Sequence, residues 1–153
     1  MDLFLIRHAI AEERRPGLLD SDRELTNKGR ARFEAMVKSL DRSGVCFDHV
    51  YCSPWLRAVQ TAELLEPITN GPLIETDELA EAPRAELFAL LEGEKVACVG
   101  HEPWMSDALS LLTTGDPNSL SVRFKKGGVA WLRGTPHPAA MELRTLWGHA
   151  PPQ

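Results

Sequence analysis

Short apolar runs alternate with longer amphipathic stretches along this chain. Residues 3–6 form the first run, with no polar interruption, as expected of a strand that is covered on both faces. Three further runs of this kind predict strands at 50–52, 73–74 and 96–99. The chain therefore alternates between strand-like and helix-like segments.

The helical segments carry start and stop signals. The first is predicted to begin near Thr26, a suitable N-cap, and to stop at Gly44, with apolar residues at i, i+3, i+4 and i+7. Ser53 and Pro54 predict the next helix start, with Pro in the first helical position, and Pro67 ends that helix. The third predicted helix is expected to bury Leu87, Leu90 and Leu91. The fourth is expected to bury Trp104, Ala108, Leu111 and Leu112.

Strand–helix alternation predicts an α/β fold. Because crossovers between parallel strands place helices on both faces, we expect a three-layer α/β/α sandwich with a mostly parallel central sheet. Two final runs, 129–132 and 142–147, are expected to add an antiparallel edge. Without a linker or repeat, residues 1–153 are expected to form a single domain.

Composition excludes several classes of protein. The formal net charge of -5 argues against a nucleic-acid binder, which normally carries a basic surface. The apolar N-terminal run ends at Arg7, too early for a membrane span, and lacks the basic start of a signal peptide. The cysteines show no metal-ligand spacing and are expected to be reduced. Together these features predict a cytoplasmic protein.

Polar side chains directly follow three of the predicted strands. Arg7 and His8 follow the first, Arg57 lies one turn beyond the second, and His101 follows the fourth. The carboxyl ends of parallel strands meet at one edge of a sheet, where ligands bind. Each feature alone is ordinary, but together they predict a site built from two Arg and two His.

This set of side chains suits a phosphoryl group. Guanidinium forks match phosphate oxygens in bidentate geometry, and Arg57 would lie in the first turn of its helix, where backbone N–H groups favour an anion. A neutral His8 imidazole, its pKa held down by two cationic neighbours, can attack phosphorus and form an intermediate that water hydrolyses. His101 would donate a hydrogen bond to the transferring group.

The same residues resemble motifs of the histidine phosphatase (phosphoglycerate mutase-like) superfamily. Residues 5–9 resemble its Arg-His-Gly/Ala signature, and 25–29 its L-T-x-x-G element. Residues 53–61 resemble its S-P-x-x-R-A-x-Q-T segment, and 99–103 its second-histidine motif. The resemblance runs in order from residue 1 to about 135, and the combination of motifs is highly specific.

The resemblance implies the fold of that superfamily and a role for each matched residue. His8 would be the phosphorylated nucleophile, and the phosphate pocket would consist of Arg7, Arg57 and His101. No metal and no cofactor would take part.

Within the superfamily the chain is most similar to the SixA-type phosphohistidine phosphatases. Its compact length, Ala9 and the sequence that begins at Arg23 support this, although those proteins often have Pro where Glu24 stands. The similarity implies that Arg23 approaches the pocket and contributes to substrate binding.

The chain has no room for the large lid insertion of bigger superfamily members, which often carries a proton-donating Glu. Glu78 and Glu81 are the candidates for a general acid in the short segment that remains. A phosphohistidine substrate needs less proton donation than an alkyl phosphate, because protonation of its distal nitrogen lets imidazole leave as a neutral group. We therefore expect phosphohistidine in a protein, such as a histidine-containing phosphotransfer domain, as substrate.

Other hypotheses stay open. The same four residues suit a small-molecule phosphomonoesterase that acts on a phosphorylated metabolite, or a non-catalytic phosphate-binding module. A metal hydrolase that uses His8 and His101 lacks carboxylate or Cys ligands at suitable spacing. Lys125 and Lys126 either form a solvated basic turn or line the mouth of the cleft.

Overall fold

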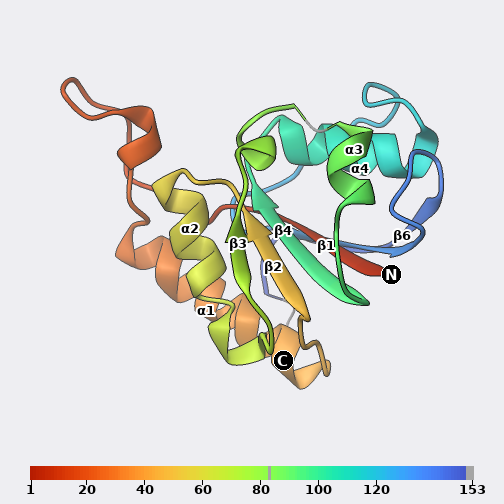
Figure 1. Cartoon of the computed structure of the whole chain (residues 1–153). Coiled ribbons are helices and arrows are strands. Elements are labelled where there is room, and N and C mark those ends of the chain that lie inside the picture. Colours follow the sequence, from red (N-terminus) through yellow and green to blue (C-terminus); the bar gives the residue numbers. More distant parts are fainter. Residues whose placement is uncertain (83, 151–153) are drawn as a thin grey trace.

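One six-stranded sheet runs through the protein (Figure 1). The computed structural model describes residues 1–82 and 84–150 of the 153. The strand order is β3-β2-β4-β1-β5-β6, parallel from β3 to β1 and antiparallel at β5 and β6. The strands are β1 (Asp2–Arg7), β2 (His49–Cys52), β3 (Leu73–Glu75), β4 (Lys95–Gly100), β5 (Val129–Gly134) and β6 (Met141–Trp147). The predicted mostly parallel sheet with an antiparallel edge is confirmed.

Helices cover both faces of the sheet, α1 and α2 on one face and α3 and α4 on the other (Figure 1). This is the predicted three-layer α/β/α arrangement. In the described ranges, no helix is long and apolar enough to cross a membrane. The helices are α1 (Asn27–Arg42), α2 (Leu56–Glu63), α3 (Ala85–Ala89) and α4 (Trp104–Thr114), with short 3-10 helices η1 (Asp20–Asp22), η2 (Glu66–Ile68) and η3 (Asp77–Ala80).

Alternate residues of the central strands pack into two different cores. Along β1, Phe4 and Ile6 pack into the core beneath α1 and α2, whereas Leu3 and Leu5 pack into the core beneath α3 and α4. Burial of each such side chain contributes about 1.5–3 kcal/mol to the free energy of unfolding. The apolar runs are continuous because a polar residue on either face would enter a core.

Helix α1 begins as the sequence predicts. The Thr26 hydroxyl accepts a hydrogen bond from the Gly29 backbone N–H (2.9 Å), and Thr26 is the N-cap. Gly29 is required at this point, because a Cβ atom there would lie 2.1 Å from the carbonyl oxygen of Ile10. The L-T-x-x-G element thus presses the start of α1 against the chain that leaves β1.

Helix α2 begins later than predicted, at Leu56 instead of Pro54, with Trp55 as its N-cap. The hydroxyl of Ser53 still accepts a hydrogen bond from the Trp55 backbone N–H (3.2 Å), but it also contacts His101. The chain after β2 therefore makes a turn before the helix begins.

Two predicted apolar stripes are partly wrong. Helix α3 has five residues, so Leu90 at its end points outward and is 74 % exposed. In α4, Trp104 and Leu111 are only half-buried. The side chains of α4 that are fully buried in the core are Met105, Ala108, Leu109 and Leu112.

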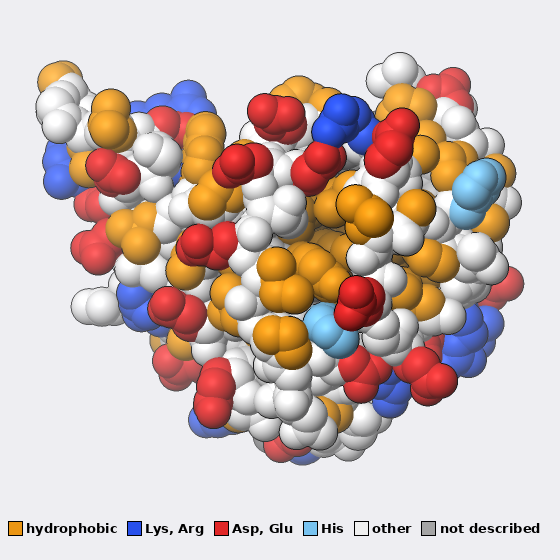
Figure 2. Space-filling view, viewed as in Figure 1, with side chains coloured by type: hydrophobic (Ala, Val, Ile, Leu, Met, Phe, Trp, Pro, Cys, Tyr) orange, Lys and Arg blue, Asp and Glu red, His pale blue; other side chains and the backbone are white. Residues whose placement is uncertain are grey.

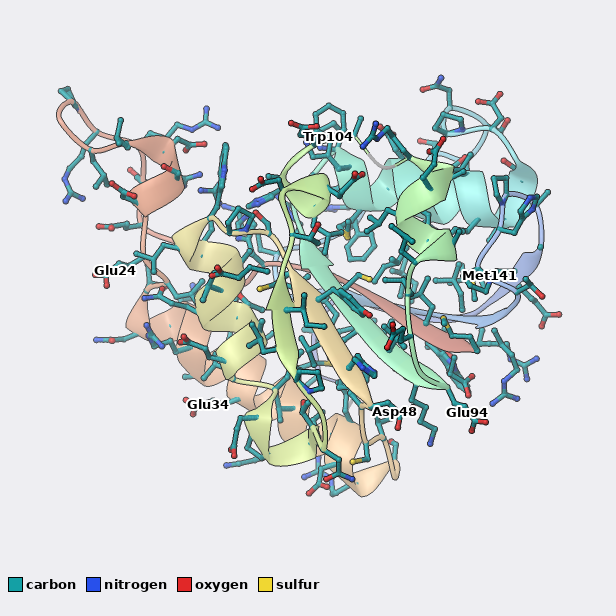
Figure 3. All side chains as sticks on the ribbon, viewed as in Figure 1. Glu24, Glu34, Asp48, Glu94, Trp104 and Met141 are labelled. Carbon is teal, nitrogen blue, oxygen red and sulfur yellow. The ribbon has the colours of Figure 1, made fainter. Side chains whose placement is uncertain are left out.

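The two ends of the sheet differ in character. Residues 12–24 project beyond the carboxyl ends of the strands (Figure 1), and a bridge between Ala11 and Leu25 closes the base of this segment. At the opposite end, the Asp48 carboxylate accepts hydrogen bonds from the backbone N–H groups of Glu94 and Lys95, at 2.7 and 2.8 Å (Figure 3). Side-chain to backbone hydrogen bonds hold the loops together at that end, whereas a long segment projects from the end where the strands finish.

Candidate active site

The carboxyl ends of β1, β2 and β4 meet because these strands are neighbours in the sheet. Arg7 lies opposite Gly100 in the register of β1 and β4, so the histidine that follows each strand emerges beside the other. The ring centroids of His8 and His101 are 5.3 Å apart. Arg57, in the first turn of α2, places its Nε 3.2 Å from Nε2 of His8. The structure therefore brings all four predicted residues together.

The His8 ring is held in one tautomer. Its Nδ1 lies 2.7 Å from the carbonyl oxygen of Ala9, which can only accept, so Nδ1 carries the proton. Nε2 is then unprotonated and accepts the hydrogen bond that Arg57 donates from Nε. A fixed imidazole with one unprotonated nitrogen is suited to nucleophilic attack.

The Arg57 guanidinium is fixed on several sides. Its Nη1 donates to the backbone carbonyl of Asp20 (2.6 Å), and its Nη2 lies 3.4 Å from the Asp20 carboxylate. Its central carbon lies 4.8 Å from the centroid of the Trp55 ring. Because this side chain has lost its freedom before a ligand arrives, it is preorganised to bind one.

Asp20 joins the projecting segment to the site. Besides Arg57, its carboxylate pairs with Arg23 (2.8 Å) and Arg14 (3.1 Å). Burial acts to raise the pKa of this carboxyl, but Arg57 and Arg23 outweigh burial and lower it. The ionised Asp20 therefore offsets part of the positive charge gathered at the site and holds Arg23 close to it.

Two buried nitrogen atoms of the site lack a hydrogen-bond partner among the described residues: Nε of Arg7 and Nδ1 of His101. The rest of each side chain is anchored. Nη1 of Arg7 donates to the carbonyl of Phe124 (2.8 Å), and Nε2 of His101 lies 2.8 Å from the hydroxyl of Ser53. Because buried polar atoms are rarely left unpaired, these two atoms point to a ligand.

A pocket of about 500 Å³ opens onto these side chains, and its lining includes Arg7, His8, Arg23, Arg57 and His101. Neither predicted candidate for the general acid lines it: Glu78 pairs with Arg84, and Glu81 is exposed. The carboxylates in the lining are those of Glu13 and Glu102. Lys126 also lines this pocket, whereas Lys125 lines a neighbouring cavity.

Both histidines are neutral at physiological pH. Burial is the main cause that lowers the pKa of His8, and the hydrogen bond to the Ala9 carbonyl offsets part of this effect. Arg57, His101 and Arg7 also lower this pKa, and together these causes bring it to about 3. Burial, followed by Arg57, lowers the pKa of His101 to about 4. The cationic neighbours that the sequence predicted contribute, but burial has the larger effect.

These shifts predict that acid destabilises the protein. Below pH 6.5 the unfolded chain protonates both histidines, whereas the folded protein does not until the pH reaches about 3 to 4. The free energy of unfolding then falls with the pH by about 1.4 kcal/mol per pH unit for each His. Urea unfolding at pH 7 and pH 4.5 should show that His8→Asn and His101→Asn each lose about 2.5 kcal/mol less than the wild-type protein. Equal losses in all three proteins would contradict these shifts.

Sequence reasoning missed three contributions to the site. Asp20 carried no local signal, because its role depends on the projecting segment folding back onto α2. Trp55 carried no signal of a role in the site, yet the centroid of its ring lies 5.0 Å from that of the His101 ring. Ser53 did carry a signal, since it directly follows β2, but that signal was interpreted as a helix cap.

The sequence profile of the histidine phosphatase superfamily (branch 1) matches residues 3–86, which include Arg7, His8 and Arg57. An uncharacterized protein of Picosynechococcus sp. is 33 % identical over 142 residues, which cover 87 % of this chain and 85 % of that protein. The chain belongs to the histidine phosphatase superfamily.

Among solved structures, the protein histidine phosphatase SixA in complex with tungstate matches with a TM-score of 0.82 and 24 % identity, over 96 % of each chain. A candidate phosphohistidine phosphatase SixA from Agrobacterium tumefaciens matches with a TM-score of 0.75 and 27 % identity, over 95 % of this chain and 96 % of that chain. A candidate alpha-ribazole-5'-P phosphatase from Escherichia coli matches with a TM-score of 0.77 and 19 % identity, over 96 % of each chain. The protein is a phosphatase of this superfamily with a SixA-like fold, and the names of these structures refer to different substrates.

Proposed function

We propose that this protein hydrolyses a phosphoryl group through a covalent phosphohistidine intermediate on His8. The observation that carries the proposal is the fixed tautomer: Nδ1 is bound to the Ala9 carbonyl, and the electron pair of Nε2 faces Arg57. Such an imidazole can attack without first losing a proton. We propose that the chain works as one domain in the cytoplasm, without metal or cofactor.

In the first step, Arg7 and Arg57 bind the non-bridging oxygens of the phosphoryl group and neutralise their charge. Nε2 of His8 attacks phosphorus while the bond to the leaving group breaks, and the leaving atom keeps the bonding electron pair. The phosphorylated ring becomes more positive, and the Ala9 carbonyl stabilises it through the Nδ1 proton. Water then attacks phosphorus, one water proton passes to solvent, and inorganic phosphate leaves a neutral His8.

We propose phosphohistidine in a protein, such as a histidine-containing phosphotransfer domain, as the substrate. A protonated imidazole leaving group needs little help from a general acid, which agrees with a pocket that neither Glu78 nor Glu81 lines. The described residues between β3 and β4 include the short elements η3 and α3, and we propose that this segment does not act as a large lid. A pocket without a large lid can admit a phosphorylated side chain on a protein surface.

A phosphorylated metabolite is the second candidate substrate. An alkyl leaving group needs a proton, and Glu13 and Glu102 line the pocket where a general acid would act. Glu102 also accepts hydrogen bonds from the backbone N–H and the hydroxyl of Ser106, at 2.8 and 2.6 Å. Glu13 is therefore the less encumbered acid for this chemistry.

A substrate panel separates these proposals. The wild-type protein would be offered a phosphorylated histidine-containing phosphotransfer domain, free phosphohistidine and a set of phosphorylated metabolites that includes alpha-ribazole 5'-phosphate. We expect the highest kcat/KM for the phosphoprotein, insensitivity to EDTA, and an acid-labile phosphate on His8 after rapid quenching. A hundredfold preference for a metabolite would favour the second candidate. Phosphate binding without release from any substrate would favour a phosphate-binding module.

A further inference from the structure

A second cavity lies next to the catalytic pocket and shares Arg7 and Lys126 with it. Its volume is about 700 Å³, larger than that of the pocket over His8. Helix α1 forms one wall, and residues 123–127, before β5, form another. We call this space the basic cavity, after the side chains that line it.

Among the described residues, the lining of the basic cavity includes no Asp or Glu. Its ionisable members are Arg7, Arg32, Arg123, Lys125, Lys126 and His149. Within the described ranges, Arg32, Arg123, Lys125 and Lys126 form no salt bridge, although arginines elsewhere on the surface do. The whole chain carries a net charge of -5, and acidic side chains are spread widely over the face in Figure 2. The cavity is therefore a local positive site on an acidic protein, which attracts anions.

The floor of the basic cavity is apolar. Phe33, Met36 and Phe124 line it and are 1 to 3 % exposed. Low-dielectric walls of this kind strengthen the field of nearby charges and provide contact for aliphatic atoms. The matching ligand therefore carries negative groups on an aliphatic frame.

The same backbone positions this cavity and the nucleophile. The Gly127 N–H donates to the carbonyls of Arg7 (3.1 Å) and His8 (2.9 Å), and the Arg7 N–H donates to the carbonyl of Gly128 (3.1 Å). Gly127 has a φ of 73°, in the left-handed region that favours glycine. The backbone that follows Lys125 and Lys126 is thus anchored to the backbone of Arg7 and His8.

We propose that the basic cavity binds the carboxylate side chains of an acidic segment adjacent to the phosphorylated residue of a protein substrate. This inference rests on the proposed function, because it requires a phosphoprotein whose phosphoryl group reaches His8. Asp and Glu supply both the negative charge and the aliphatic atoms that the cavity matches. A metabolite with a single phosphate would fill only the catalytic pocket, so the basic cavity would favour protein substrates.

Synthetic substrates test the inference directly. They are a phosphohistidine peptide flanked by Asp residues, the same peptide with Asn in place of each Asp, and free phosphohistidine. The test variant Arg32→Gln/Arg123→Gln removes one cation from each wall of the cavity. The matched control Lys38→Gln/Arg42→Gln removes two exposed cations from the end of α1 that line neither space.

For the test variant we expect KM for the acidic peptide to rise about tenfold with kcat unchanged, since each exposed pairing contributes modestly. Its KM for the Asn peptide and for free phosphohistidine should stay at the wild-type value, as should every KM of the control variant. Added salt should reduce the wild-type preference for the acidic peptide, because these charges are exposed.

Equal KM values of the wild-type protein for the two peptides would overturn the inference, as would equal effects of the two double variants. A failure of the proposed function looks different, because the wild-type protein would then hydrolyse neither the phosphohistidine peptides nor free phosphohistidine. In that case fluorescence anisotropy of the labelled, unphosphorylated acidic peptide tests the cavity alone. A loss of affinity of about tenfold in the test variant only would support the inference, and equal affinities would overturn it.

Discussion

Replacing His8 with Ala is expected to lower kcat for phosphate release by at least ~10⁴-fold, as is typical when a covalent nucleophile is removed. The variant loses the unprotonated Nε2, which the hydrogen bonds of the ring to the Ala9 carbonyl and to Arg57 hold in a fixed position. Steady-state phosphate release measures the loss of turnover, and acid-labile phosphate after rapid quenching measures the loss of the phosphorylated intermediate.

The matched control is His137→Ala, which removes an exposed imidazole from the turn between β5 and β6. We expect this variant to retain wild-type rates. Circular dichroism and thermal unfolding establish that the His8→Ala protein is folded. Turnover by the folded variant within about tenfold of the wild-type rate would refute the covalent mechanism.

Arg57→Lys is expected to lower kcat/KM by about 10²- to 10³-fold, the usual effect of losing one preorganised donor to the transition state. Lysine keeps the positive charge but has one nitrogen instead of three. It cannot at once reach Nε2 of His8, the Asp20 carbonyl and a phosphoryl oxygen. The loss therefore measures the geometry of the guanidinium fork separately from its charge.

Arg144→Lys is the control for this substitution, because Arg144 lies on β6 and pairs with exposed Glu142 at 3.0 Å. Its kcat/KM should be unchanged. Competitive inhibition by inorganic phosphate gives a second measurement and should weaken only in Arg57→Lys. An Arg57→Lys protein with wild-type kcat/KM and inhibition would show that the fork is not used.

The order of strands and helices was predictable because a strand that is buried on both faces needs an unbroken run of apolar residues. Residues 3–6 and 96–99 are unbroken apolar runs, and the structure buries every one of those side chains. The start of α2 was not predictable, because the Ser53 hydroxyl, the local capping group, is shared with His101. Leu90 was assigned to the core because the short extent of α3 is not visible in its composition.

The four central residues of the site were also predictable. Each lies at or just after a strand, or one helical turn beyond it, and parallel strands deliver such residues to one edge of a sheet. Asp20 was not, because its ion pairs with Arg57 and Arg23 form only when residues 12–24 fold back against α2. Likewise, the placement of Glu13 and Glu102 at the pocket, with Glu78 and Glu81 outside its lining, depends on loop paths that composition does not encode.

By itself, the sequence determined the layered fold and the two arginines and two histidines that meet at its edge. The spacing of apolar residues and the type of each residue are local properties of the chain. Burial in a sheet requires a particular pattern of both, so the pattern can be recognised in the sequence. Only the tertiary structure decided which nitrogen of His8 carries the electron pair, why burial outweighs charge in lowering its pKa, and that a basic cavity adjoins the site. Tautomers, pKa shifts and cavities arise from groups that are distant in sequence, so they exist only after the chain has folded.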